Sequence, residues 1–281
     1  MKFMYYVNGK YLHQDDAKIP VADLGVVRGF GVFDYLRTYD KKPFLLWDHL
    51  KRLKASADQL GLKIPQLLEE IAQIVYKLLE LDGFEESGIK IVVTGGGSVD
   101  GLIPESRPSL IVMTTPFKPF APHFYMHGAR AITTHLTRLF PQAKTTSYIS
   151  AIVALQKAKE SSADEAIYMA AQGEVLEATT SNLFFFKKGV LITSNSDQIL
   201  KGITRQVVLD LAYNIYPIEE RPITRDELAE CEEAFLTSSN KEIFPLSHID
   251  HFSFKIGDQT RHLRSLFSSF VKEKFKSSQC A

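Results

Sequence analysis

The chain has 281 residues, of which 45% are apolar and 23% charged, a composition typical of a globular protein with a sizeable core. Lysine plus arginine and aspartate plus glutamate both number 33, so neither a nucleic-acid partner nor an anionic membrane is favoured. Two cysteines, Cys231 and Cys280, are too few for a disulfide framework. No run approaches the roughly 20 apolar residues of a membrane span, and the N-terminal residues lack a signal-peptide core. We therefore expect a cytoplasmic protein, and the sequence indicates no metal site.

The first part of the chain alternates strand and helix patterns. "FMYYVNGKYLH" places two aromatic-rich runs around an Asn-Gly pair, which predicts a hairpin. A second strand pair is expected from "GVFDYLRTYD" to "PFLLW", and further strands from "GIKIVVT" and "SLIVMTT". Residues 48–62 predict an amphipathic helix with Asp48 as its N-cap, and residues 66–81 predict another.

Prolines at positions 116, 119 and 122 interrupt this pattern, because proline cannot continue a helix or a central strand. We place an N-terminal α/β domain at residues 1–117, a Pro-rich linker at 118–125 and a C-terminal domain at 126–281. The expected fold class is α+β or α/β in two domains. In the second part we expect a strand at 128–134, helices near 147–160, from about 204 and near 260–275, and a hairpin through 187–189.

A lone glutamate, Glu177, follows a strand-like apolar run in "GEVLEATTSNLF" and precedes a cluster of small hydroxyl residues. A solvated turn would explain a glutamate at this position. A pocket that needs an anion beside hydrogen-bond donors would explain it equally well. The local pattern does not separate the two interpretations, so other parts of the sequence have to be considered.

Four other stretches carry residues that could act in catalysis or bind a phosphate. Lys144 lies just before a predicted helix; it is either an exposed loop lysine or an amine able to form a Schiff base with a carbonyl. Thr204, after Gly202, is placed as a helix N-cap, and the free N–H groups of such a helix start also suit a phosphate. Arg52 is a surface charge or a guanidinium for a phosphate. Residues 237–240, "TSSN", offer small donors or an ordinary turn.

Together these stretches resemble one family. "RGFGVFDYLRTY", "HLKRLKASA", a lysine shortly before Tyr148, "GEVLEATTSNLF", "KGITR" and "AFLTSSNKEI" follow one another in the chain. In this order and at these separations they resemble the class IV aminotransferases, the fold-type IV pyridoxal-phosphate enzymes. The family includes branched-chain aminotransferases, D-amino-acid transaminases and aminodeoxychorismate lyase. The resemblance covers about residues 5 to 270. It implies a smaller N-terminal α/β domain, a larger C-terminal pseudo-barrel domain that carries the cofactor lysine, and a homodimer.

The resemblance also implies pyridoxal 5′-phosphate (PLP) as cofactor and a role for each matched residue. Lys144 would hold PLP as a Schiff base and then move the proton between the substrate Cα and the cofactor C4′. Glu177 would face the pyridine nitrogen and keep it protonated. The remaining contacts implied by similarity are Arg52, Ile203, Thr204 and Ser239 to the phosphate, Tyr148 to the ring hydroxyl, and Ser181 and Asn182 along the same site.

No substrate signature of the family is intact in this chain. D-Amino-acid transaminases carry an arginine and a histidine where this chain has Asp100 and Leu102, and branched-chain enzymes often carry a tyrosine and an arginine where it has Gly88 and Lys90. The lyases tend to show an Arg-Gly where the chain has a Gly-Gly pair. By similarity, the residues that would contact the substrate are Phe33, Arg37, Lys90 and Asn240.

The favoured function is an aminotransferase of the branched-chain type, which moves an amino group from an apolar amino acid to 2-oxoglutarate. Its partners would be small amino acids and 2-oxo acids. One alternative is an aminodeoxychorismate lyase that forms 4-aminobenzoate and pyruvate, and another is a D-amino-acid transaminase. A cofactor-binding protein without activity is a third, which the intact Lys144 and Glu177 oppose.

Overall fold

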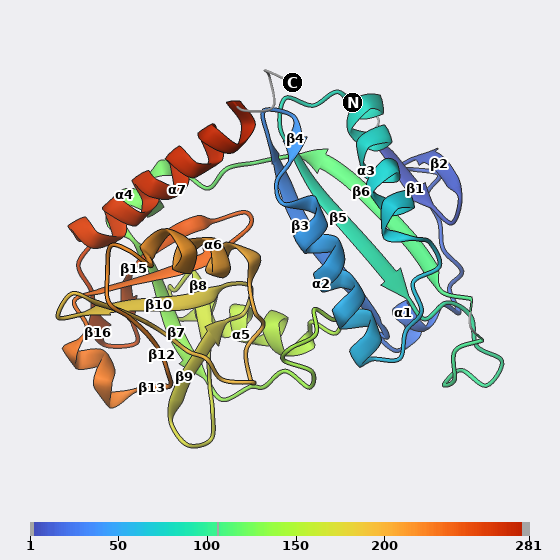
Figure 1. The fold of residues 1–281 in the computed structure, drawn as a ribbon. Coiled ribbons are helices and arrows are strands. Elements are labelled where there is room, and N and C mark those ends of the chain that lie inside the picture. Colours follow the sequence, from blue (N-terminus) through green and yellow to red (C-terminus); the bar gives the residue numbers. More distant parts are fainter. Residues whose placement is uncertain (1–2, 106, 277–281) are drawn as a thin grey trace. The chain divides into compact units, whose positions relative to one another are not determined.

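The computed structural model describes residues 3–105 and 107–276 (Figure 1). The chain divides into two compact units. The first comprises the residues up to Lys118 together with Ala143–Ser147, and the second comprises Pro119–Gln142 and the residues from Tyr148 onward. Cys280 lies outside the described residues, and Cys231 is a buried free thiol.

Within its described residues, the first unit has one antiparallel sheet of six strands in the order β2-β1-β6-β5-β3-β4. The predicted hairpin around Asn8-Gly9 is confirmed as β1 and β2. Asn8, at φ +45°, and Gly9, at φ +93°, both adopt the left-handed conformation that a tight hairpin turn requires. The strands are β1 (Met4–Val7), β2 (Lys10–His13), β3 (Gly31–Tyr39), β4 (Lys42–Pro43), β5 (Ser87–Thr94) and β6 (Ser109–Pro116).

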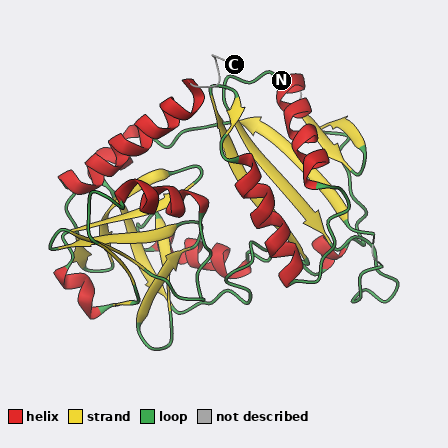
Figure 2. Cartoon of the chain, in the orientation of Figure 1, coloured by secondary structure: helices red, strands yellow, loops and turns green. Residues whose placement is uncertain are grey.

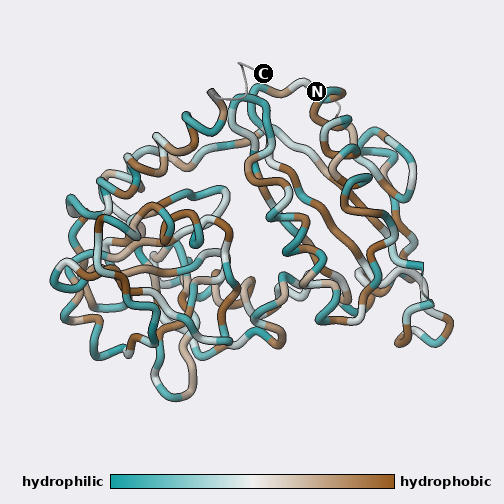
Figure 3. Tube along the Cα trace, viewed as in Figure 1, coloured by the Kyte–Doolittle hydropathy of each residue, from teal (hydrophilic) through white to brown (hydrophobic). Residues whose placement is uncertain are grey.

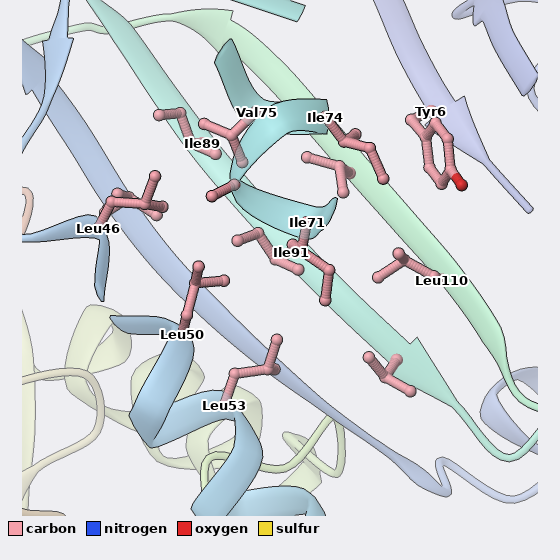
Figure 4. Packing of buried hydrophobic residues seen from close by; sticks show 14 of the residues in the cluster. Tyr6, Leu46, Leu50, Leu53, Ile71, Ile74, Val75, Ile89, Ile91 and Leu110 are labelled. Atoms are coloured by element: carbon pink, nitrogen blue, oxygen red, sulfur yellow. The ribbon is translucent and has the colours of Figure 1, made fainter. Parts of the chain in front are cut away.

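Two helices, α2 (Leu46–Gln59) and α3 (Leu68–Asp82), cover one face of this sheet, and a short helix, α1 (Leu24–Val27), precedes β3. The apolar side chains of both helices meet alternate residues of the strands in a continuous core (Figure 4). The hydropathy colouring follows the same pattern, with hydrophobic stretches along the strands (Figure 3). Because successive strand residues point to opposite faces, the residues between these core positions lie on the other face of the sheet.

The predicted strand "PFLLW", residues 43–47, is wrong beyond Pro43. β4 ends at Pro43, Leu45 takes a left-handed conformation with φ +51°, and α2 begins at Leu46. The backbone reversal at Leu45 stops the pairing with β3. Asp48 therefore lies in the first turn of α2 and is not its N-cap; as an acidic residue there it complements the helix dipole.

In the described part of the second unit, ten strands form one mixed sheet in the order β12-β11-β10-β14-β15-β7-β8-β9-β13, with β16 paired to β15 (Figure 2). β9 and β10 also contact each other, so the sheet curls. The strands are β7 (Ala129–Thr134), β8 (Glu165–Met169), β9 (Glu174–Ala178), β10 (Asn182–Lys187), β11 (Val190–Thr193), β12 (Ile218–Glu220), β13 (Ile223–Thr224), β14 (Glu233–Ser238), β15 (Glu242–Ile249) and β16 (Phe252–Ser253).

The helices of the second unit are α4 (Pro122–His127), α5 (Ile149–Glu160), α6 (Ile203–Ala212), a 3-10 turn at Asp226–Glu230 and α7 (Asp258–Lys276). The second half of the stretch predicted as a linker is helical, since α4 begins at Pro122. Proline is well tolerated at this first helical position, where its missing N–H would have no partner within the helix. No helix among the described residues is both long enough and apolar enough to span a membrane.

The segment Ala143–Ser147 extends the first unit beside the start of β3. Thr145 forms a β-bridge with Val32, and the Lys144 carbonyl accepts the Phe33 N–H at 2.9 Å. The division expected from the sequence assigned Lys144 to the C-terminal domain, whereas these backbone hydrogen bonds group it with the first unit. Such long-range pairing to a strand more than 100 residues earlier leaves no local sequence signal.

Candidate active site

Lys144 is half-buried beside the face of the first sheet that α2 and α3 do not cover, where Phe33 and Tyr35 are also half-buried. Its backbone N–H donates to Ser56 Oγ at 3.0 Å, which fixes the main chain against α2. Its Nζ lies 4.7 Å from the centre of the Phe33 ring, and Lys90 Nζ lies 5.6 Å from the same ring. The structure therefore brings together three residues that the sequence analysis selected. An amine beside an aromatic ring is in the partly desolvated setting that a lysine nucleophile requires.

The sheet face around Phe33 is mainly apolar. Phe33 is directly opposite Val92, and Tyr35 is directly opposite Lys90, which is in turn opposite Met113. Directly opposite residues of antiparallel strands share a face, so Lys90 shares its face with aromatic and aliphatic side chains, and its ammonium group lies near the same Phe33 ring as that of Lys144. The Tyr35 hydroxyl also covers a glycine of β5, because a Cβ added at Gly88 would lie 2.6 Å from it.

Arg37 lies further along β3, stacked between two aromatic rings. Its guanidinium carbon is 3.5 Å from the ring centre of Phe117 and 4.1 Å from that of Tyr39. Its Nε donates to the Thr38 carbonyl at 3.2 Å. The flat guanidinium is held by stacking of this kind, which makes Arg37 a fixed cation on this part of the sheet.

Arg52 is anchored to β3 by a buried carboxylate. Its Nε and Nη2 donate to the two oxygens of Asp34 at 2.8 Å each, and His49 Nδ1 lies 2.7 Å from Asp34 Oδ1. Burial alone would raise the pKa of Asp34, but the charges of Arg52 and His49 and their hydrogen bonds outweigh it and hold this pKa far below its usual range. Burial also lowers the pKa of His49, against the opposing effect of Asp34. The ion pair is thus a fixed support, which orients the guanidinium predicted to bind a phosphate.

In the second unit, Glu177 is 3% exposed on β9, which excludes the solvated turn. Its Oε1 accepts hydrogen bonds from Arg138 Nη1 and from the Leu200 N–H, the latter at 3.1 Å, and its Oε2 accepts one from Asn182 Nδ2 at 3.1 Å. A buried carboxylate with donors of this kind, one of them cationic, is stabilised as an anion. A buried carboxylate held in this way suits a cationic ligand atom.

Asn182 connects Glu177 to the start of α6. Its Nδ2 also donates to the Leu200 carbonyl at 2.6 Å, and a Cβ added at Gly202 would lie 2.0 Å from its Oδ1. Gly202 is the N-cap of α6 and has no side-chain cap. The prediction of Thr204 as N-cap is therefore wrong by two residues; Thr204 lies in the first turn and is buried. The first N–H groups of a helix have no partner within it, so the amides of Ile203 and Thr204 suit a phosphate.

The remaining candidates lie on turns of the second unit. The Ser181 hydroxyl accepts a hydrogen bond from Lys241 Nζ at 3.2 Å. Ser239 and Asn240 form the turn between β14 and β15, where Ser238 Oγ donates to Asn240 Oδ1 at 2.8 Å. Tyr148 is the residue before α5, and its carbonyl accepts the Ile152 N–H at 2.9 Å. Asn182 is directly opposite Thr237 across β10 and β14, so these turns belong to adjacent strands.

These residues supply the groups that a PLP enzyme requires. A half-buried amine, a buried anion and an uncapped helix start match the cofactor's aldehyde, its ring nitrogen and its phosphate, respectively. No cluster of three or more histidine, cysteine, aspartate or glutamate side chains among the described residues could hold a metal ion. The fit to PLP rests on the three kinds of group present: a nucleophilic amine, a buried anion and free amides at a helix start.

The comparison with protein families agrees with this fit. Residues 31–249 match the family model of class IV amino-transferases, and the chain belongs to this family. Class IV aminotransferases are PLP enzymes, so the protein is a PLP-dependent aminotransferase. The chain is 35% identical over 274 residues to a Methanocaldococcus jannaschii protein provisionally described as a branched-chain-amino-acid aminotransferase, with 93% of this chain and 94% of that one covered. It is 33% identical over 274 residues to the D-alanine aminotransferase of Listeria monocytogenes, with 95% and 94% covered.

Solved structures show the same fold. The branched-chain aminotransferase of the archaeon Thermoproteus uzoniensis, determined with norvaline, superposes with a TM-score of 0.89 at 30% identity and covers 96% of this chain and 95% of its own. The T.th. branched-chain amino acid aminotransferase with pyridoxamine 5′-phosphate gives a TM-score of 0.90 at 28% identity, with 96% and 94% covered. The predicted fold-type IV architecture is confirmed.

Arg138, Asp34 and His49 were not predicted from the sequence as parts of the site. Asp34 had a usable signal, because it occupies a core-facing position of β3 between two apolar ones, Val32 and Leu36. An ionisable residue at such a position needs a buried partner. Arg138 lies in a loop 39 residues before Glu177, and no local pattern connects the two.

Proposed function

We propose that the protein transfers the amino group of an apolar amino acid to 2-oxoglutarate, as a branched-chain-type aminotransferase. The observation that carries this proposal is the surface next to Lys144. Its Nζ lies 4.7 Å from the Phe33 ring, on a sheet face of aromatic and aliphatic side chains. An apolar substrate side chain is well received there, and Lys90 on the same face supplies a cation for the distal carboxylate of 2-oxoglutarate.

Each matched residue has a role in this proposal. Lys144 would hold PLP covalently and would move the proton between the substrate Cα and the cofactor C4′. PLP, when bound, would supply the electron sink for the charge that develops at Cα. Glu177 would accept the hydrogen bond of the pyridine nitrogen and keep it protonated. The phosphate would be bound by Arg52, the amides of Ile203 and Thr204, and Ser239. Tyr148 would contact the ring hydroxyl, and Ser181 and Asn182 would line the ring. The substrate would be contacted by Phe33, Arg37, Lys90 and Asn240.

The second candidate is a D-amino-acid transaminase, which the similarity to D-alanine aminotransferases favours. Both candidates use the same lysine and the same anion, and they differ in which face of the substrate Cα is presented to Lys144. The identity of the donor therefore separates them.

The test is a visible spectrum of the purified protein with PLP, recorded before and after separate additions of L-leucine, D-alanine and L-glutamate. A branched-chain-type enzyme loses its cofactor band with L-leucine and with L-glutamate and keeps it with D-alanine. Loss of the band with D-alanine alone would establish the second candidate. A band that no donor removes would point to the lyase, with aminodeoxychorismate as the next compound to add.

We also propose a homodimer and, from the low cysteine content, a location in the cytoplasm. The dimer is supported by apolar side chains around α5 that are exposed in the single chain: Leu139 at 87%, Ile149 at 75% and Ile152 at 54%. Exposed apolar groups of this kind commonly mark a protein interface. Light scattering of the wild type and of Ile149→Asp tests it, with a dimer expected for the first and a monomer for the second. A monomeric wild type would contradict it.

A further inference from the structure

A buried lysine outside the proposed cofactor contacts lies at the centre of a polar cluster in the second unit. Lys241 is 7% exposed and directly follows the turn Ser239–Asn240. Its Nζ donates to Glu165 Oε2 at 2.6 Å, to Thr180 Oγ1 at 3.0 Å and to Ser181 Oγ at 3.2 Å. An ammonium group has three N–H donors, and these three acceptors satisfy them.

The cluster contains an ion pair between Lys241 and Glu165, whose carboxyl group is held as an anion. Burial alone would raise the pKa of Glu165, but the charge of Lys241 and the hydrogen bonds from Lys241, Thr179 and the Ala166 N–H outweigh it and lower this pKa. Lys241 is held on its other side as well, because its carbonyl accepts the Tyr125 hydroxyl at 3.1 Å. The lysine is therefore fixed at both its main chain and its ammonium group.

The ammonium group connects two turns that carry proposed cofactor contacts. Thr180 and Ser181 lie in the turn between Glu177 on β9 and Asn182 on β10. Lys241 belongs to the turn between β14 and β15, immediately after Ser239 and Asn240. β10 and β14 are hydrogen-bonded neighbours, but strand pairing stops at their ends and does not fix the turns beyond them. The Lys241 side chain fixes these turns relative to each other, because it extends from one turn and donates hydrogen bonds to Thr180 and Ser181 in the other.

We propose that Lys241 is a positioning residue, which holds the Ser239–Asn240 turn in register with the Glu177–Asn182 segment. The inference rests on the proposed function of these residues. Fixing the turn keeps the Ser239 hydroxyl and amide directed at the phosphate while Glu177 stays at the ring nitrogen. Preorganisation of this kind raises cofactor affinity, because less ordering is required on binding.

A structural ion pair with no positioning role is the competing explanation, and a double replacement separates the two. Removing one partner of a buried pair leaves an unpaired charge, whereas replacing both with apolar residues of similar size is often nearly neutral for stability. We therefore compare Lys241→Met, which we expect to melt well below the wild type, with Lys241→Met/Glu165→Met, which we expect to melt close to it. Lys187→Met is the matched control, because it removes another ion pair of the same unit, to Glu227 at 2.9 Å.

The measurements are the melting temperature of the apo protein and the Kd for PLP from absorbance titration. We expect the double variant to bind PLP about tenfold more weakly than the wild type, by analogy with the effect of replacing residues that orient metal ligands. The control variant should bind PLP as the wild type does. A double variant with wild-type melting temperature and wild-type PLP affinity would overturn the proposal and leave the proposed function intact. A wild type that binds no PLP would instead refute the proposed function itself.

If the double variant does not fold, Thr180→Val tests the positioning role of Lys241. It keeps the shape of the side chain and removes only the hydroxyl between Lys241 and Glu165. We expect the Kd for PLP to rise about threefold, since one link of the cluster is lost while the ion pair remains. An unchanged Kd in this variant would overturn the proposal.

Discussion

Arg138 and Glu177 form an ion pair in which the carboxylate side chain is 4% exposed and the guanidinium 19% exposed. Through this pair, a loop residue stabilises the anion proposed to face the cofactor ring. The Glu177 carboxylate also accepts the Leu200 amide and the Asn182 side chain. Its position is thus set from a loop, a strand and the segment before α6.

We expect Arg138→Met to lower kcat about tenfold, since a charge-assisted hydrogen bond to a buried carboxylate is worth about 1.5–3 kcal/mol. The carboxylate would lose its guanidinium partner and be oriented less firmly toward the ring nitrogen. Steady-state kinetics with saturating PLP measures the effect. Arg138→Lys, which keeps the charge, should retain most of the activity. Equal kcat values for Arg138→Met and the wild type would show that the pair has no part in the reaction.

The buried His49 predicts a pH dependence of stability. Burial lowers its pKa below the ordinary value of 6.5, and the positive charges of Arg52 and Lys144 add to this against the opposing charge of Asp34. Between that lowered pKa and 6.5 the unfolded chain binds more protons than the folded one. Stability is therefore complete above about pH 6.5 and falls as the pH drops through this window, by up to about 1.4 kcal/mol per pH unit from this group.

Urea unfolding of the apo protein between pH 7.5 and 5 measures this dependence. His49→Asn keeps a side-chain N–H donor for Asp34 and removes the titrating group. The variant should lose less stability over this range than the wild type. If both proteins showed the same slope, His49 would not be the group responsible.

A methyl group at the start of α6 should weaken cofactor binding. The Cβ of Gly202→Ala would lie 2.0 Å from Asn182 Oδ1, and Asn182 has little room to move because its amide is bonded to Glu177 and Leu200. Either Asn182 or the first turn of α6 has to shift, which displaces the amides proposed for the phosphate. We expect the Kd for PLP to rise about tenfold. Gly97→Ala is the matched control, since a Cβ there meets nothing within 4 Å, and its affinity should be unchanged.

Much of the fold could be predicted from local pattern. The Asn8-Gly9 hairpin and α3 follow from turn chemistry and apolar periodicity, because both depend on neighbours in the chain. The boundaries of β4 and α2 could not be predicted, since they depend on the left-handed conformation of Leu45, where no glycine or asparagine marks the turn. The place of Lys144 beside β3 depends on a pairing across more than 100 residues.

The residues of the candidate site also include some that a local pattern marks and others that it does not. The pattern around Glu177 drew attention to it but left a solvated turn and a pocket equally open, and only the family resemblance assigned it a role. Its partner Arg138 was not predictable, and neither was the pair of Lys241 and Glu165, which lie 76 residues apart. An ion pair between distant segments leaves no trace in local composition, so such partners appear only once the sheet is assembled.

The most direct measurement is the position of the lysine that holds the cofactor. The protein with bound PLP is reduced with sodium borohydride, which makes the link permanent, then digested and analysed by mass spectrometry. We expect the phosphopyridoxyl group on the peptide that contains Lys144, and we expect Lys144→Ala to lose both this label and the visible cofactor band. Lys54→Ala, which removes an exposed lysine of the same unit paired with Asp58, should keep both. A label on any other lysine of the wild type would contradict the assignment of Lys144 as the cofactor lysine.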